Sequence, residues 1–245
     1  MLITRIMMFC LSCRHEYQKI VSVVIFIFLL LLQISFNISF AQMLVSQVQL
    51  QAGDLLFQDL NCGELCDGIN KVTRGINGAK LSHVGMVINV TKTQVTIVEA
   101  YSNRVSEISL SDFLNRSKDR QAHPRVIVGR LTIAYQALVP AAIAFAKKQL
   151  AKPYNETFVQ NGKSYYCSEL IYAAFKHANQ GVPIFTLSPM NFKDPVNQQF
   201  LPEWKIYFDK LQMQPPQGQL GSNPGRMSTE KNIRIVYKYG EVRDE

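Results

Sequence analysis

Short runs of apolar and β-branched residues predict strands in two parts of the chain. Four runs lie in the first half, each bounded by polar or turn-forming residues, at 53–60, 82–90, 94–101 and 125–131. Only three residues separate the second run from the third, and this spacing predicts a β-hairpin. A further run at 232–239, beyond a turn-rich linker at 214–225, predicts an edge strand.

Apolar residues with helical spacing alternate with these strands. They predict short helices at 66–75 and 109–117, a longer helix at 137–150 and another within 163–181. Pro140 is compatible with this pattern because it would lie in the first turn of its helix. The mixture of an antiparallel hairpin, further strands and helices predicts one α+β domain in which a sheet packs against helices.

The helix within residues 163–181 combines an apolar face with one cysteine. The face consists of Leu170, Ile171, Ala174, Phe175 and Ala178. Gly181 and Pro183 predict the C-terminal end of this helix. Ser164 is the expected N-terminal cap, which would place Cys167 in the first turn. There the helix dipole and free N–H groups favour a thiolate, so Cys167 is a candidate nucleophile, with a buried and inert thiol as the alternative.

The first 41 residues have the pattern of an export signal. Three basic residues precede an apolar run at 20–32, and small residues at positions 39 and 41 suit a signal peptidase. We expect cleavage after Ala41 and a location in the periplasm or cell envelope. The apolar run is short for a membrane span, but an uncleaved anchor is the alternative, and it would be the expected contact with a membrane.

The charge of the chain does not indicate a nucleic-acid partner. The chain has 26 Lys and Arg and 18 Asp and Glu; without the first 41 residues it has 23 and 17, which is a net charge of +6. No dense basic run or aromatic–basic stripe remains, so we expect no binding of nucleic acid. A mild attraction to anionic envelope surfaces and a merely solvated surface explain this charge equally well.

Three cysteines remain beyond the predicted signal: Cys62, Cys66 and Cys167. An exported protein meets an oxidising compartment, where an odd cysteine points to one free thiol. In the segment NCGELCDG, Cys62 and Cys66 either form a disulfide, which leaves Cys167 free, or pack as two thiols beside a turn. These two cysteines are a weak zinc signal because no second Cys or His pair accompanies them at metal-binding spacing.

The predicted hairpin brings a histidine next to a glutamate. With a three-residue loop at 91–93, residue 83 lies opposite 101 and residue 85 lies opposite 99. His83, Gly85 and Glu99 then share one face, because side chains on a strand alternate. His83 and Glu99 become diagonal neighbours, roughly 7–8 Å apart between backbones, and Gly85 leaves space beside them. A register slip of one residue would undo this arrangement.

Cys167, His83 and Glu99 supply the parts of a thiol-based catalytic site. A thiol nucleophile needs a base within hydrogen-bond reach, and the base needs a group that fixes its orientation. A histidine at a strand end with a chance acidic neighbour is the alternative, and a zinc site made of the same three residues is possible but less favoured. His177 lies too far along its helix to reach Cys167, and His123 lies in a polar loop.

Several segments together resemble the circularly permuted branch of the papain-like NlpC superfamily, the YiiX-like proteins: GDLLF, CGELCDGI, LSHVGMVI, VEAY and GKSYYCSELIYAAF. In that branch the histidine strand precedes the cysteine helix, as it does here. The resemblance implies a permuted papain-like fold with Cys167 as nucleophile, His83 as base and Glu99 as the orienting residue. It also implies that Tyr166 lies near the substrate or the oxyanion and that Tyr154 is structural.

This resemblance covers residues 53 to about 202 and predicts the domain organisation. We expect a signal peptide at 1–41, an N-terminal extension at 42–52, a catalytic domain at 53–208 and a C-terminal extension with a turn-rich linker at 209–245. Neither extension matches the family pattern.

The expected function is that of an exported cysteine hydrolase. It would cleave an amide or peptide bond in cell-envelope material, from peptidoglycan or lipid, through a Cys–His–Glu triad and a thioacyl intermediate, with no cofactor and no metal. The fold does not fix the substrate. Two alternatives remain open: a lipid-directed thiol hydrolase or acyltransferase, and a non-catalytic binding module on the same fold.

Overall fold

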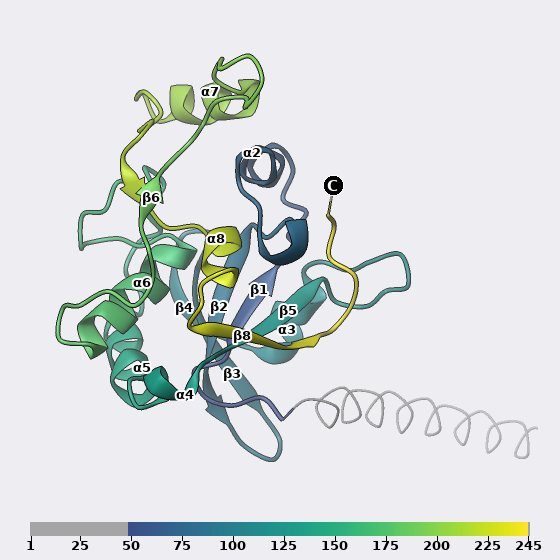
Figure 1. Cartoon of the computed structure of the whole chain (residues 1–245), viewed down its shortest axis with the longest axis vertical. Coiled ribbons are helices and arrows are strands. Elements are labelled where there is room, and N and C mark those ends of the chain that lie inside the picture. The colour runs from purple at the N-terminus through teal and green to yellow at the C-terminus, as the bar shows by residue number, and fades with distance from the viewer. Residues whose placement is uncertain (1–48, 245) are drawn as a thin grey trace, which may run out of the picture. The chain divides into compact units, whose positions relative to one another are not determined.

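The computed structural model describes residues 49–244, so the predicted signal peptide and most of the predicted N-terminal extension lie outside it. A six-stranded sheet forms the centre of the unit that begins at Leu50, as Figure 1 shows. In this described part, no helix has the length and apolar character needed to cross a membrane. The strands and helices together confirm the predicted α+β class.

Antiparallel pairing joins all six strands in the order β4-β3-β2-β1-β5-β8. Their bounds are β1 (Leu55–Gln58), β2 (His83–Val90), β3 (Val95–Tyr101), β4 (Arg104–Ser109), β5 (Val126–Leu131) and β8 (Ile233–Lys238). The late strand β8 lies at the edge, as predicted. The opposite edge strand, β4, is an addition to the predicted set, and most of its residues are exposed or half-buried.

The hairpin of β2 and β3 keeps the predicted register where it matters for the site. Met86 pairs with Val98 and Val87 with Ile97, which continues the predicted alignment of residue 85 with residue 99. Toward the loop the register shifts by one, at a bulge between Val87 and Asn89. The connection therefore has four residues, 91–94, rather than the predicted three.

Ten further short elements surround the sheet in the part of the chain that the structure describes. They are α2 (Glu64–Val72), η1 (Ile76–Gly78), α3 (Leu110–Asn115), α4 (Ile133–Gln136), α5 (Val139–Lys148), α6 (Cys167–Ala178), β6 (Ser188–Pro189), α7 (Pro202–Lys210), β7 (Leu220–Gly221) and α8 (Pro224–Ser228). Strands β6 and β7 pair with each other in a separate small sheet. Helix α8 begins inside the segment predicted to be a linker, and α7 lies where no element was predicted.

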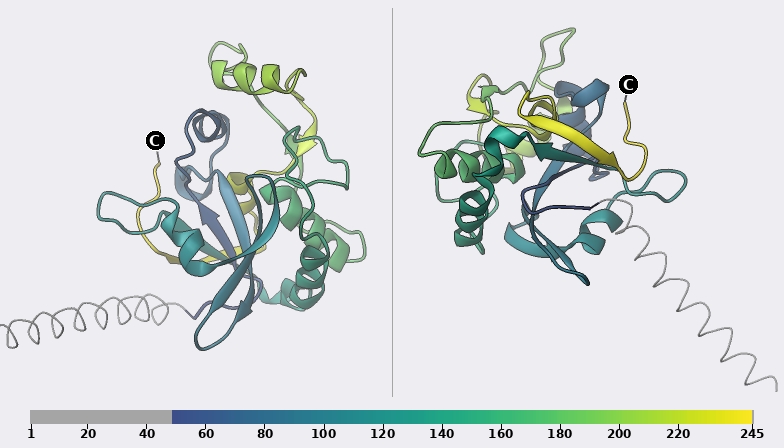
Figure 2. Two further views of the ribbon diagram at one scale, coloured as in Figure 1. Left: turned by 180° about the vertical axis from the view of Figure 1, so that it is seen from behind. Right: turned by 60° about the horizontal axis from the view of Figure 1, so that its bottom comes forward.

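The sheet carries helices on both faces. The alternate β2 residues Val84, Met86 and Ile88 join the main core with α5 and α6, as predicted for this face. Helix α3 covers the opposite face (Figure 2). Its Phe113 lies close to Gly85. Burial of apolar side chains is the dominant favourable term in folding, so packing on both faces stabilises β2 and β3.

The N-terminus of α6 differs from the prediction in its cap. Tyr166, and not Ser164, occupies the N-cap position, so Cys167 is the first helical residue. The hydroxyl of Ser164 instead bonds with Asn161, within the preceding loop. This change leaves Cys167 in the first turn, as predicted. At the other end, Gly181 has a φ of 89°, which favours glycine just beyond a helix.

An aromatic cluster forms a second core beside the sheet. Its buried members are Phe158, Tyr166, Phe192, Leu201, Trp204 and Phe208. The rings meet edge to face, for example Phe192 with Trp204 at 5.0 Å between ring centroids. An ion pair between Lys71 and Glu203 links α2 to α7. The aromatic cluster thus joins the late segment to the start of α6.

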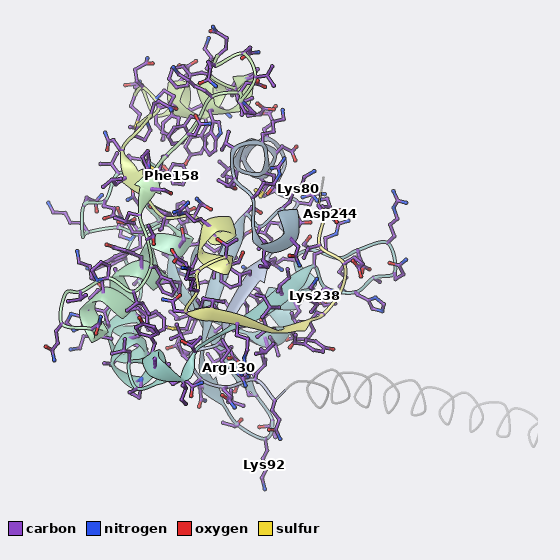
Figure 3. The ribbon with its side chains drawn as sticks, viewed as in Figure 1. Lys80, Lys92, Arg130, Phe158, Lys238 and Asp244 are labelled. Carbon is purple, nitrogen blue, oxygen red and sulfur yellow. A yellow bond between two sulfur atoms is a disulfide. The ribbon has the colours of Figure 1, made fainter. Side chains whose placement is uncertain are left out.

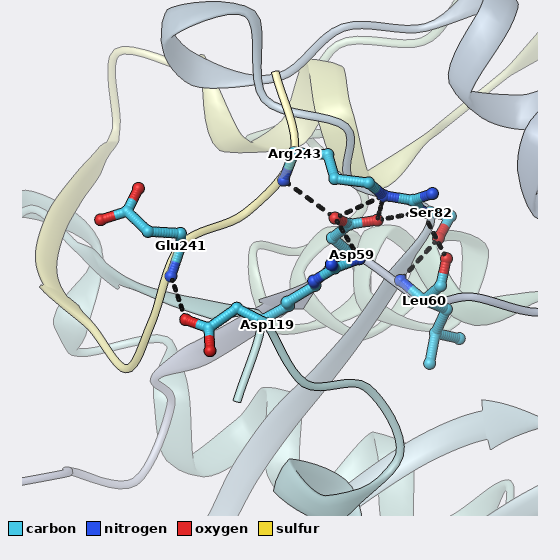
Figure 4. Close-up of polar contacts among 7 residues, drawn as sticks. Asp59, Leu60, Ser82, Asp119, Glu241 and Arg243 are labelled. Carbon is cyan, nitrogen blue, oxygen red and sulfur yellow. Dashed lines mark hydrogen bonds and ion pairs between the residues drawn. The ribbon is translucent and has the colours of Figure 1, made fainter. Parts of the chain in front are cut away.

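The end of the chain is bound to the same unit. The guanidinium of Arg243 donates to the buried carboxylate of Asp59, and the N–H of Glu241 donates to Asp119, as Figure 4 shows. Strand β8 lies in the main sheet beside β5. The sequence predicts a C-terminal extension from residue 209, but these contacts make that segment part of the compact unit that begins at Leu50.

Cys62 and Cys66 form a disulfide at the start of α2. This is one of the two arrangements that the sequence left open. Cys167 is the one free cysteine among residues 49–244, and it is buried.

Candidate active site

The three predicted catalytic residues come together where α6 begins beside the sheet. His83 is the first residue of β2, Glu99 lies on β3, and Cys167 is the first residue of α6. All three are buried: their exposed fractions are 3 %, 0 % and 5 %. Figure 3 shows Lys92 at the tip of the β2–β3 hairpin, whereas His83 is at the other end of β2, as its first residue.

A short hydrogen bond joins the histidine to the glutamate. His83 Nε2 lies 2.7 Å from Glu99 Oε2. This contact occupies Nε2, so Nδ1 is the ring nitrogen left to interact with Cys167, whose side chain contributes to the raised pKa of His83. The imidazole therefore lies between a carboxylate and a thiol. The hairpin register predicted that His83 and Glu99 would be neighbours.

Arg116, directly after α3, is a site residue that the sequence analysis did not identify. Its guanidinium donates to both oxygens of Glu99, with 2.7 Å from Nη1 to Oε2. Its Cζ lies 4.0 Å above the ring centroid of Tyr101, in a cation–π contact. Such a two-nitrogen fork fixes the carboxylate in one orientation. The one available signal was the position of Arg116 in the predicted helix 109–117.

Aromatic rings also hold the imidazole in place. The ring centroid of His83 lies 5.2 Å from that of Tyr101 and 5.7 Å from that of Phe113. The space predicted beside Gly85 is filled: a Cβ on this glycine would lie 2.7 Å from Ile97 and 2.9 Å from Phe113. Glycine is therefore needed here so that α3 can approach the sheet and cover the histidine.

The electrostatics favour a protonated imidazole and an ionised carboxylate. Burial works against the charged form of His83, but its hydrogen bonds with Cys167 and Glu99 outweigh burial and raise its pKa to about 9. Burial likewise opposes ionisation of Glu99, yet the hydrogen bonds from His83 and Arg116 lower the pKa of this carboxyl below its usual value. The site thus stores a proton on His83.

The first turn of α6 supplies a free donor beside the thiol. The earliest backbone bond of this helix runs from the N–H of Leu170 to the carbonyl of Tyr166, at 3.0 Å. No partner within the described residues accepts the backbone N–H of Cys167. The N–H groups at a helix start carry partial positive charge, so they suit an anion that forms next to the cysteine.

Tyr166 faces the same pocket as Cys167. Its hydroxyl oxygen accepts the backbone N–H of Ser222 at 3.0 Å, and the Ser222 hydroxyl bonds with Ser168 at 3.1 Å. Burial raises the pKa of Tyr166 to about 12, so the phenol keeps its proton as a donor. Ser222 gave no signal in the sequence, because it lies in the segment predicted to be a linker.

The buried side chain of Glu169 binds the backbone at the start of α6. Glu169 Oε2 accepts the backbone N–H of Tyr166 at 3.3 Å and the side-chain amide of Asn155 at 3.0 Å. Burial raises the pKa of Glu169 to about 7 against the effect of these two bonds. Tyr154, which was expected to be structural, lines the pocket.

The pocket that reaches Cys167 has a volume of about 380 Å³. Helix α2, the aromatic cluster, the β6–β7 pair and α8 form its walls. His83 does not itself line this pocket, whereas its neighbour Ser82 does. The pocket is large enough for a small ligand group to lie against the sulfur.

The arrangement does not suit a metal ion. Within residues 49–244, no three or more His, Cys, Asp and Glu side chains form a group that could hold one. Glu99 in addition has both oxygens bound by Arg116 and one by His83, so it has little capacity left for a cation. The less favoured zinc site of His83, Glu99 and Cys167 therefore has no support in this donor set.

Residues 49–237 match the family described as "Permuted papain-like amidase enzyme, YaeF/YiiX, C92 family". A search of curated proteins gave no match. A solved structure with a similar fold is that of the metalloprotein yiiX from Escherichia coli O157:H7, with 20 % identity and a TM-score of 0.62. The alignment covers 78 % of this chain and 98 % of that one. These findings confirm the predicted family and fold and extend the match beyond residue 208.

Proposed function

We propose that this chain, which belongs to the YaeF/YiiX (C92) family of permuted papain-like amidases, hydrolyses an amide bond through a Cys167–His83–Glu99 triad. One observation carries the proposal. A buried imidazole bonds to Glu99 and interacts with Cys167, the first residue of a helix, and both interactions raise the pKa of His83. This is the set of contacts that an activated thiol requires.

Acylation begins with the proton held on His83. The Cys167 thiolate attacks the carbonyl carbon of the amide, and the C=O π electrons move to the oxygen. The free N–H of Cys167 and the phenol of Tyr166 are the donors proposed for this oxyanion. His83 then gives its proton to the amide nitrogen, the C–N bond breaks, and the amine leaves behind a thioester on Cys167.

Deacylation reverses the proton movement. His83, now neutral, takes a proton from water as the water oxygen attacks the thioester carbonyl. The C–S bond breaks and the acid leaves. Cys167 is again a thiolate and His83 is again protonated, which is the starting state. Glu99 keeps the imidazole oriented and stabilises its charged form in both halves of the reaction, without taking the proton itself.

The location of the reaction is part of the same proposal. The pattern in residues 1–41 supports export, with cleavage after Ala41, and envelope material is then the accessible source of amide bonds. N-terminal sequencing of the protein recovered from the periplasm or medium tests this part. Material that begins at Gln42 is the expected result, and an intact Met1 in every fraction would contradict cleavage.

The named metalloprotein neighbour does not change the proposed chemistry. At 20 % identity, the likeness to that metalloprotein extends to the fold alone. The donor set here, with Glu99 already bound by Arg116, favours thiol chemistry. A non-catalytic binding module would have no use for an arginine fork that orients the glutamate behind a histidine.

Alkylation of Cys167 by iodoacetamide as a function of pH tests the proposed pair. We expect rapid, site-specific labelling at pH 6, located by mass spectrometry, because His83 stabilises the thiolate there. His83→Ala should slow labelling at pH 6 by about 10²-fold or more. His177→Ala, on the same helix, is the matched control and should leave the rate unchanged. Equal labelling of wild type and His83→Ala would refute the pair.

A further inference from the structure

Helices α4 and α5 present an apolar surface that no other part of the described chain covers. Residues 131–146 contain no charged side chain, and this run spans α4 and most of α5. Ile133 is 83 % exposed, an extreme value for a large apolar residue. The other exposed residues of the run are small and apolar: Ala134, Ala137, Pro140, Ala141 and Ala144. Ile133 and these five residues are called the apolar face below.

Helix α5 is apolar on its buried side as well as on its exposed side. The buried side joins the main core, where Phe145 packs on His177 of α6 with 4.8 Å between the ring centroids. A helix at the surface of a folded domain usually carries polar side chains on the side away from the core, and a helix that is apolar all round is usually covered. An exposed apolar patch of this kind marks an interaction site.

The end of the apolar face is cationic. Lys147 and Lys148 are exposed in the last turn of α5. Lys147 Nζ lies 3.7 Å from Oε1 of Glu107 on β4, but both side chains are well exposed, so solvent weakens this pair. Residues 131–148 contain no Asp or Glu. Two copies packed face to face would therefore bring these lysines together with no acid in the face to meet them, and an anionic partner is favoured.

The described chain begins beside this face. A Cβ on Gly53 would lie 2.5 Å from the side chain of Val139, the first residue of α5. Gln51 lines a hollow of about 210 Å³ together with Pro140 of the apolar face. Residues 42–53 contain no charged side chain, so the chain that leads into the first strand adds no charge next to α5. The uncharged surface is thus continued by the segment that enters beside it.

We propose that the apolar face of α4 and α5 docks on an anionic lipid surface, with Ile133 inserted among the head groups and Lys147 and Lys148 bound to lipid phosphates. The contact is peripheral, because each helix is far shorter than a membrane span. Apolar insertion and the attraction of lysines to phosphates act together in helices that lie on a membrane surface. The inference is independent of the proposed amide hydrolysis, and it gives the processed chain a membrane contact that needs no uncleaved anchor.

Sedimentation with lipid vesicles tests the inference. The protein used is residues 42–245, which contains the compact unit that begins at Leu50 and lacks the apolar run at 20–32. One set of vesicles contains phosphatidylglycerol and phosphatidylethanolamine in equal parts, and the other contains phosphatidylcholine alone. We expect binding to the anionic vesicles to be at least about tenfold tighter, because lysines near an anionic surface favour binding. High salt should weaken it by screening this attraction.

A charge placed on the apolar face tests the insertion step. Ile133→Glu should weaken binding to the anionic vesicles by about tenfold or more, because it removes the burial of one large apolar side chain. Val196→Glu is the matched control, since Val196 is 90 % exposed in the loop before α7. Helix α7 lies at the opposite end of the described unit from α4, as Figure 1 shows, so this control should bind as the parent does. Urea unfolding should give the same midpoint for both variants and the parent.

The lysines are tested by two variants of equal net charge. Lys147→Gln combined with Lys148→Gln should weaken binding to the anionic vesicles by roughly 30-fold and leave binding to phosphatidylcholine unchanged. Lys205→Gln combined with Lys210→Gln removes the same charge from α7 and should change the affinity by less than about twofold, because these lysines lie away from the docked surface.

Four results would overturn the inference. Three are the absence of sedimentation with anionic vesicles, equal binding to the two kinds of vesicle, and Ile133→Glu binding as tightly as the parent. The fourth concerns the competing occupant and is measured by sedimentation equilibrium without lipid. A dimer that Ile133→Glu dissociates, in a protein that binds no vesicles, would assign the apolar face to a second copy of this chain.

The rate of Cys167 alkylation keeps this inference separate from the proposed function. Ile133→Glu should leave that rate unchanged at pH 6, since no residue of the apolar face lines the pocket at Cys167. Binding to anionic vesicles by a protein whose Cys167 reacts slowly at pH 6 would keep the lipid surface and reject the activated thiol. Rapid alkylation without vesicle binding would keep the thiol and reject the lipid surface.

Discussion

The two halves of the site are constructed in opposite ways. The polar half comes from β2, β3, α3 and the first residue of α6, and charge-assisted hydrogen bonds join its members. The pocket half comes from α2, α7, α8 and the β6–β7 pair, and ring contacts, one disulfide and one partly exposed ion pair hold it. The polar half is built into the main sheet, whereas the pocket half is a separate layer beside it.

This difference separates reaction chemistry from substrate choice. Glu99 is fully buried and bonds to both His83 and Arg116, so we expect few substitutions to be tolerated there. The pocket wall rests on apolar contact, which tolerates changes of shape more readily. Under the proposed function, a family with this plan keeps the proposed triad and changes its substrates by altering residues 188–229 and α2.

The largest effect is expected for Glu99→Gln. The amide keeps the shape of the carboxylate but cannot stabilise imidazolium, so the pKa of His83 should fall and kcat should drop by roughly 10³–10⁴. The kinetics of amide cleavage and the pH dependence of alkylation measure the two effects. Glu107→Gln, an exposed position on β4, is the matched control. A loss of less than about tenfold would mean that Glu99 only packs against the histidine.

A smaller effect is expected for Arg116→Met, which keeps the stem over Tyr101 and removes the charge. Arg116 helps to lower the pKa of Glu99, so this pKa should rise in the variant. The depressed pKa contributes stability above the unfolded carboxyl value and loses it as pH falls through the folded value. In the variant this loss should begin at higher pH, with a free energy of unfolding about 3 kcal/mol lower at pH 7. Urea unfolding between pH 3 and 7 measures it, and identical acid limbs in variant and wild type would contradict it.

The polar half was largely predictable from the sequence because local rules determine it. Alternation along two strands with a short connection placed His83 beside Glu99, and the bulge at Val87 and Asn89 absorbed the error in loop length before it reached the site. The cysteine helix followed from its apolar face. Arg116 was not predictable, because its role depends on the way α3 folds back over Gly85, and a six-residue helix reveals no such direction.

The pocket half was not predictable for a physical reason. Its members come from both ends of the described chain and meet through tertiary contacts alone. Helix α8 has five residues in a segment rich in proline and glycine, which reads as a linker. The β-branched run predicted strand β8, but not its pairing with β5. Residues before β8 line the pocket at Cys167, and this placement depends on tertiary burial, which a sequence period does not reveal.

Removal of the disulfide is expected to affect the pocket half and to leave the polar half almost unchanged. Cys62→Ser with Cys66→Ser should lower the free energy of unfolding by about 2 kcal/mol, because the bond closes a short loop at the start of α2. Trp204, which packs on Gly68 of this helix, should shift its emission to longer wavelength. The rate of Cys167 alkylation should change less than about twofold, since no polar-half residue contacts the disulfide. A parallel fall in that rate would show that the halves are coupled.

The smallest effect on stability is expected for substitution of Glu169, which binds the start of α6 between the two halves. Its pKa is raised to about 7, chiefly by burial, so the folded protein prefers the neutral carboxyl. This preference costs nothing below the unfolded value of about 4.5, and the cost grows as pH rises to about 7 and is constant above it. Glu169→Gln keeps an acceptor for Tyr166 and Asn155 without the charge. It should match wild type at pH 4.5 and gain about 1 kcal/mol at pH 8 in urea unfolding, whereas Glu107→Gln should show no such trend. A variant less stable than wild type at pH 8 would mean that the carboxylate charge itself holds the N-terminus of α6.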